Sequence, residues 1–114
     1  MMKRILGLTA AAVLLSAGAA FADPIEGTWK TEPGESAAIE PCGDAFCIKV
    51  TTGKHAGKQI GKMSPNGANA YKGTITDPTE DKTYSGSGKV SGKTLTLKGC
   101  VAAIFCKSQT WSKL

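Results

Sequence analysis

The chain has 114 residues with 14 basic and 9 acidic side chains, and its formal net charge is +5 at pH 7. Beyond residue 22 it carries 12 lysines, no arginine and 9 acidic residues, and the lysines are spread rather than clustered. Arginine is the residue that best reads phosphate and base edges, so this composition argues against nucleic-acid binding. The length allows one small domain, which gains stability from covalent cross-links.

The first 22 residues have the pattern of a secretory signal peptide. A short basic start precedes an apolar run that is shorter than the ~20 residues of a membrane span. The run ends in Ala20-Phe21-Ala22, which predicts cleavage before Asp23. We therefore expect a signal peptide over 1–22 and a single domain over 23–114, in a protein that is periplasmic or secreted and does not span the membrane.

The remainder of the chain alternates in polarity, which is the signature of half-buried β-strands. In "FCIKVT" one face carries Phe46, Ile48 and Val50, and in "TLTLK" one face carries Leu95 and Leu97. Turn residues recur every 8 to 14 positions or so, which is typical of an antiparallel meander. We expect seven to eight strands, near 26–31, 36–41, 46–52, 58–63, 70–76, 82–90, 93–99 and 106–113.

Two similar phrases, "GTWKT" and "QTWSKL", hold the only tryptophans, one in the first strand and one in the last. An open meander has two exposed edges, and closing it removes both. Trp29 and Trp111 would then be neighbours at the seam, and Lys113 would place its ammonium over an indole ring. We predict an all-β, small, antiparallel up-and-down barrel; the alternative is an open sheet with two ordinary core tryptophans.

Four cysteines lie beyond residue 22, and in an oxidising compartment they predict two disulfides. The local pairs Cys42–Cys47 and Cys100–Cys106 close short loops worth about 2 kcal/mol each, whereas crossed pairs would be worth about 4 kcal/mol each. Hairpin geometry in "PCGDAFC" nevertheless favours the local pairs. The spacings Cys-x4-Cys and Cys-x5-Cys are loose for zinc, so no metal site is expected.

Gly27-Thr28-Trp29 resembles the G-x-W signature of the calycin superfamily, which includes the lipocalins. The ordered set of G-x-W, the early cysteine pair, "GTITDP", "TYSG", "LTLKGC" and "SQTW" is similar to a bacterial family of exported proteins known only as a domain of unknown function. The resemblance implies a barrel floor built from Gly27 and Trp29, with Lys113 as the basic residue that covers it. It implies no established activity.

Signals for catalysis are weak in this sequence. The single histidine, His55, lies in "GKHAGK", which lacks the spacing and the hydroxyl residue of a phosphate-binding loop. The acidic "DPTED" is followed by Lys82 where a calcium loop requires glycine. We therefore expect no enzyme activity and no cofactor.

Calycin barrels often hold small apolar molecules, and we expect such a ligand at the barrel mouth. Its contacts are predicted to be Tyr71, Tyr84, Phe46 and Ile75. Inward glycines at 73, 86 and 88 either leave room for a ligand or mark strongly bent strands. The alternative function is a module that contacts a protein or an anionic component of the cell envelope through its lysines.

Overall fold

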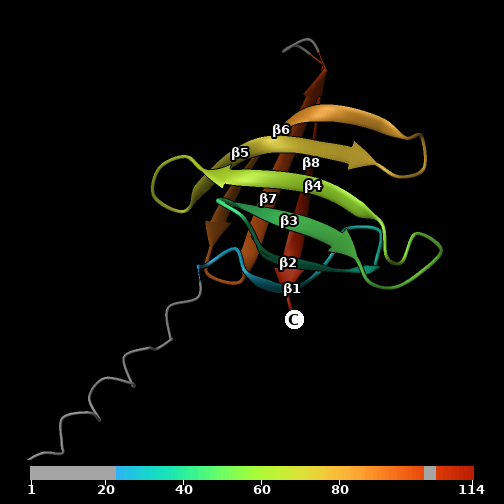
Figure 1. Ribbon diagram of the computed structural model, residues 1–114, viewed down its shortest axis with the longest axis horizontal. Coiled ribbons are helices and arrows are strands. Elements are labelled where there is room, and N and C mark those ends of the chain that lie inside the picture. The colour runs from blue at the N-terminus through green and yellow to red at the C-terminus, as the bar shows by residue number, and fades with distance from the viewer. Residues whose placement is uncertain (1–22, 102–104) are drawn as a thin grey trace, which may run out of the picture.

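Eight antiparallel strands follow one another around a closed barrel in the computed structural model, which describes residues 23–101 and 105–114 (Figure 1). The strands are β1 (Gly27–Lys30), β2 (Ser36–Cys42), β3 (Ala45–Val50), β4 (Gln59–Pro65), β5 (Ala70–Asp77), β6 (Lys82–Ser91), β7 (Thr94–Val101) and β8 (Phe105–Lys113). The predicted all-β up-and-down barrel is confirmed. The predicted signal peptide lies outside the described residues.

Alternating polarity forms these strands in the way that the sequence indicates. In β7, Leu95 and Leu97 are buried, whereas Thr94, Thr96 and Lys98 are exposed. Tight turns join the strands; Gly43 between β2 and β3, with φ of 68°, has the positive φ that favours glycine. The pattern therefore sends one face of each strand into a single core. Within the described ranges, no segment forms a helix with the length and hydrophobicity of a transmembrane span.

Closure of the barrel depends on a short seam between β1 and β8. Trp29 pairs with Lys113 and Lys30 pairs with Ser112, and the backbone N–H of Leu114 donates to the carbonyl of Thr28 at 2.9 Å. In Figure 1, β7 and β8 run behind β2–β5 and across their direction. The N-terminal segment and the C-terminus consequently meet at one end of the barrel, which we call the closed end.

The inward glycines mark close approach of neighbouring atoms rather than empty space. A Cβ on Gly73 would lie 1.9 Å from the carbonyl oxygen of Lys62, and one on Gly86 would lie 2.7 Å from Cγ1 of Ile75. A Cβ on Gly88 would lie 3.3 Å from Cδ2 of Leu97. The middle of the barrel is thus filled, and any room for a ligand is limited to one end.

Two disulfides staple hairpins on the barrel wall. Cys42–Cys47 joins β2 to β3, and Cys100–Cys106 joins β7 to β8 at positions that are direct cross-strand partners. These are the local pairs that hairpin geometry favours. At the second staple, Cys100 is also the last residue of β7 that pairs with β6, opposite Ser85, and the β7–β8 pairing continues to Val101 and Phe105.

Candidate functional site

The closed end is sealed by the residues that the sequence places at the seam. Trp29 is fully buried, and its indole N–H donates to the carbonyl of Ile25 at 2.9 Å. Lys113 lies over the Trp29 ring, with 5.0 Å from its Nζ to the ring centroid. Gly27 has a φ of +131°, and a Cβ there would lie 2.9 Å from Cε of Lys113. Gly27, Trp29 and Lys113 therefore pack closely together at this end, and we call this cluster the floor.

Trp111 lies next to this floor, two residues before Lys113 on β8. Because Trp29 pairs with Lys113, Trp111 is its diagonal neighbour across the seam, at a separation of about 7–8 Å between such positions. Its indole N–H donates to the side-chain oxygen of Gln109 at 2.8 Å. Trp111 belongs to the buried core and also lines the cavity described below.

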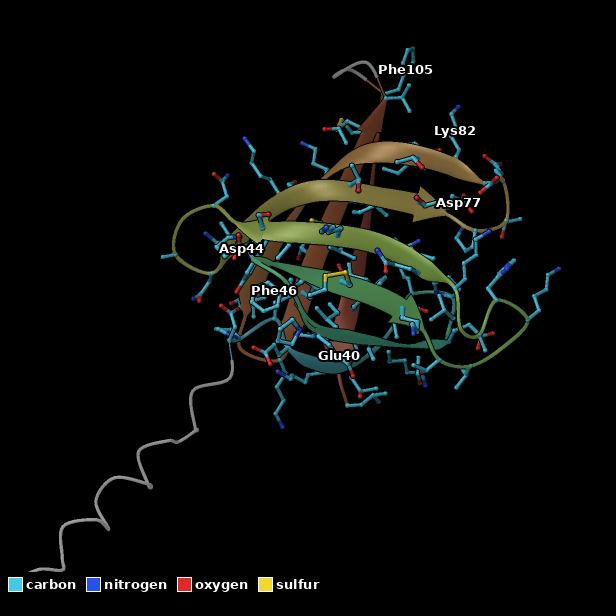
Figure 2. All side chains as sticks on the ribbon, in the orientation of Figure 1. Glu40, Asp44, Phe46, Asp77, Lys82 and Phe105 are labelled. Atoms are coloured by element: carbon cyan, nitrogen blue, oxygen red, sulfur yellow. A yellow bond between two sulfur atoms is a disulfide. The ribbon has the colours of Figure 1, made fainter. Side chains whose placement is uncertain are left out.

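Phe46 and Tyr71, two of the four residues predicted to meet a ligand, lie at the closed end. Their rings meet edge to face with 6.0 Å between centroids. The Tyr71 hydroxyl donates a hydrogen bond to the carboxylate of Asp23. Burial of the phenol, followed by this bond to Asp23, raises the pKa of Tyr71. Figure 2 shows Phe46 far from Asp77 and Lys82, which lie towards the opposite end.

The opposite, open end contains a cavity of about 480 Å³. Its apolar wall is formed by Val50, Ile60, Ile75, Leu97 and Trp111. Its polar rim comes from loops and strand ends, and includes Glu35, Lys54, His55, Asp77, Lys107 and Gln109. Ile75 and Tyr84, the other two predicted ligand contacts, line this cavity. The four predicted residues are therefore divided between the two ends of the barrel.

Tyr84 lies at the border between this cavity and a second hollow of about 470 Å³. The second hollow, which we call the outer hollow, lies between the start of β6 and the β7–β8 hairpin. Lys107 lines both the cavity and the outer hollow. The Tyr84 side chain packs across Gly99, where a Cβ would lie 3.1 Å from Cβ of Tyr84. The Nζ atoms of Lys82 and Lys107 lie 5.9 and 5.8 Å from the centroid of the Tyr84 ring.

Several residues of the open end were missed by sequence reasoning. Lys107 and Gln109 share the inner face of β8 with Trp111, so counting back in twos from the tryptophan would have found them. His55, which the sequence does not assign to a site, lies on the rim. No signal in the sequence marks it, because its position depends on how the β3–β4 loop folds over the mouth.

The open end offers apolar surface under a polar rim, which suits noncovalent binding of a small molecule. In the part of the chain that the structure describes, no three His, Cys, Asp or Glu side chains gather closely enough to hold a metal ion. The open end thus presents a candidate site with apolar surface at its base and charged groups at its rim.

Comparison with protein families gives one match. The family described as "Uncharacterized protein conserved in bacteria (DUF2147)" matches residues 56–113, which is just over half of the chain. This segment includes β4 to β8, and with them Ile75, Tyr84, Trp111 and Lys113. Comparisons with curated proteins and with solved structures found no match. The resemblance to a bacterial family of unknown function is confirmed, and the chain belongs to this family.

Proposed function

We propose that the protein is an exported, non-catalytic binding protein that holds a small apolar molecule in the cavity at the open end of its barrel. The observation that carries this proposal is the cavity itself. Its volume of about 480 Å³ lies within the usual range for small-molecule sites, ~300–1,000 Å³, and its wall is apolar.

The contrast between the two ends supports a role for the hollow. At the closed end, Trp29 and its neighbours fill the barrel, and at mid-height the inward glycines are covered by Ile75 and Met63. At the open end, apolar core side chains such as Ile75, Leu97 and Trp111 also border a hollow. Covering such surface contributes about 25 cal/mol per Å², so an apolar ligand would stabilise the folded protein.

Export is supported by the cysteine chemistry and by the leader-like sequence. Both disulfides require an oxidising compartment to persist, and bacteria provide one in the periplasm. All four cysteines are paired in the described residues. A chain that stayed in the cytoplasm would keep these thiols reduced.

The test is a titration of the chain from residue 23 to residue 114 with 1-decanol, followed by tryptophan fluorescence. Trp111 lines the cavity, whereas Trp29 lies in the floor. A Trp29→Phe variant therefore leaves Trp111 as the single source of tryptophan fluorescence. Leu97→Phe should fill the cavity and weaken decanol binding. Thr96→Phe, on the exposed face of the same strand, is the matched control and should leave binding unchanged.

The proposal fails if decanol neither changes the fluorescence nor raises the melting temperature of the protein. Native mass spectrometry of protein taken directly from cells supplies an independent measurement, because a retained ligand adds its mass to that of the chain. Recovery of the apo mass alone, together with no response to decanol, would rule out a ligand-carrying role.

A surface module that contacts an envelope component is the second candidate. It is favoured by Phe105, which is 68% exposed at the start of β8 (Figure 2). Phe105 lines the outer hollow together with Lys82 and Lys107. Such a module would capture an anionic partner in a strongly salt-dependent manner and would show no response to decanol.

A further inference from the structure

We propose that the molecule held in the open-end cavity is an anionic amphiphile: its apolar body fills the barrel mouth and its carboxylate or phosphate group binds Lys82 and Lys107 beside Tyr84. This inference rests on the proposed function and adds the chemical class of the ligand. Three observations support it: both lysines lie close to Tyr84, the nearby carboxylates have other hydrogen-bond partners, and the two hollows share lining residues.

The two lysines occupy inner-face positions of their strands, and both ammonium groups approach the same aromatic ring. Lys82 has the parity of Tyr84 and Gly86 on β6, and Lys107 has the parity of Gln109 and Trp111 on β8. Each Nζ lies less than 6 Å from the centroid of the Tyr84 ring, at 5.9 and 5.8 Å. Two like charges that share one aromatic ring repel each other, and an anion bound beside them removes that repulsion.

The acidic groups of the rim are already engaged. Glu35 accepts a hydrogen bond from the Thr52 hydroxyl at 2.7 Å, and the Asp77 carboxylate accepts one from the backbone N–H of Thr79 at 2.9 Å. Among residues 23–101 and 105–114, the ion pair within 4 Å is Lys58–Asp81, which leaves Lys82 and Lys107 without a carboxylate partner at that distance. Glu80 lines the outer hollow, so two ammonium groups face one carboxylate there.

The apolar cavity adjoins the outer hollow, which the two lysines line. Tyr84 and Lys107 line both hollows and Lys82 lines the outer one, so a ligand whose apolar chain lies in the cavity would place its head group at Tyr84 and Lys107, with Lys82 on the outer side. The Cys100–Cys106 disulfide holds the hairpin that carries Lys107. A free inorganic anion would use only the exposed charges, and a neutral alcohol only the apolar wall. A molecule with both parts gains from both.

The experiment compares decyl compounds that differ in the head group, each below its critical micelle concentration, by calorimetric titration of residues 23–114. The compounds are decanoate, monodecyl phosphate, 1-decanol and decyltrimethylammonium. The dissociation constant of at least one anion should be about tenfold lower than that of decanol, as expected for two exposed charge contacts. The cationic compound should bind most weakly, and the preference should shrink in 1 M salt.

Lys82→Gln/Lys107→Gln should remove the preference for the anion, so that decanoate, monodecyl phosphate and 1-decanol bind this variant with similar dissociation constants. The matched control is Lys89→Gln/Lys98→Gln, which removes two exposed lysines from the outer faces of β6 and β7 and should retain the preference. Decanoate and monodecyl phosphate together show which head group the lysines select.

Equal binding of the anions and decanol, or a preference that survives Lys82→Gln/Lys107→Gln, would overturn this inference while leaving the apolar site intact. Failure of every decyl compound to bind would instead remove the proposed function, and with it the inference. The two failures are distinguishable because decanol tests only the apolar wall.

Discussion

The ammonium of Lys113 lies 5.0 Å from the centroid of the Trp29 ring, across the seam that joins the last strand to the first. The same Nζ donates to the carbonyl of Glu26 at 2.8 Å and to that of Pro24 at 3.2 Å. One side chain therefore covers the buried indole and also ties down the segment that precedes β1. Closure of the barrel and sealing of its floor depend on the same residue.

Lys113→Ala should lower the free energy of unfolding by about 1–3 kcal/mol, because it removes a cation–π contact and two hydrogen bonds from a charged donor. Lys113→Arg keeps the charge and several donors and should lose less. Urea denaturation of both variants provides the measurement, with Lys89→Ala on the outer face of β6 as control. Equal stability of Lys113→Ala and the parent chain would show that the floor does not need this residue.

The seam could be predicted because its evidence is local in the sequence. Strand polarity alternates visibly, and the repeated Thr-Trp phrases mark the first and last strands as neighbours. The parity of Lys113 then gives the face on which its side chain lies. Each of these inferences uses only the two-residue period of a strand, which the sequence displays directly.

The position of a residue along the barrel axis could not be predicted in the same way. Tyr71 and Tyr84 both point inward, yet Tyr71 packs at the closed end and Tyr84 borders the open cavity. Parity gives the face of a strand but not the height, which depends on register and on the tilt of the strands. The pairing of Tyr84 with Ile75, four residues beyond Tyr71 on β5, shows that register.

Tyr71 should make stability fall at alkaline pH. Its pKa is raised in the folded state by burial and by the bond to Asp23, so the folded protein holds the phenolic proton more tightly than the unfolded chain does. The contribution is complete below the unfolded pKa of 10.0 and is lost as the pH rises above that value. Unfolding free energies measured between pH 8 and pH 11 should therefore decrease more steeply for the parent than for Tyr71→Phe.

Tyr71→Phe is a suitable comparison because it keeps the ring that packs on Phe46 and removes the titrating hydroxyl. At neutral pH it should cost about 1–2 kcal/mol through the lost hydrogen bond to a carboxylate. All other groups are common to both proteins and cancel in the difference. Parallel pH curves for the two proteins would refute the assignment.

The two disulfides should differ in their effect on binding although they are similar in their effect on stability. Each closes a short loop, so Cys42→Ser/Cys47→Ser and Cys100→Ser/Cys106→Ser should each cost about 2 kcal/mol. Only the second pair holds the extended hairpin that carries Lys107. Decanoate binding should weaken in Cys100→Ser/Cys106→Ser and persist in Cys42→Ser/Cys47→Ser, and the reverse order would contradict this placement of the anion site.

The backbone nitrogen of Asp23 lies 3.1 Å from the Glu26 carboxylate, at the residue that the sequence predicts to follow the cleaved signal peptide. Cleavage there would turn an amide donor into an ammonium group, whose hydrogen bond to a carboxylate is stronger. A chain that begins at Asp23 should therefore be more stable than one with a Gly-Ser extension, by about 0.5–1 kcal/mol for a partly exposed pair. Glu26→Gln should abolish this difference, and so should a pH above about 9, where α-amino groups are neutral. Two results would contradict this prediction: identical melting temperatures of both chains, or a mature amino terminus that mass spectrometry places at another residue. Either would show that cleavage before Asp23 does not stabilise the closed end.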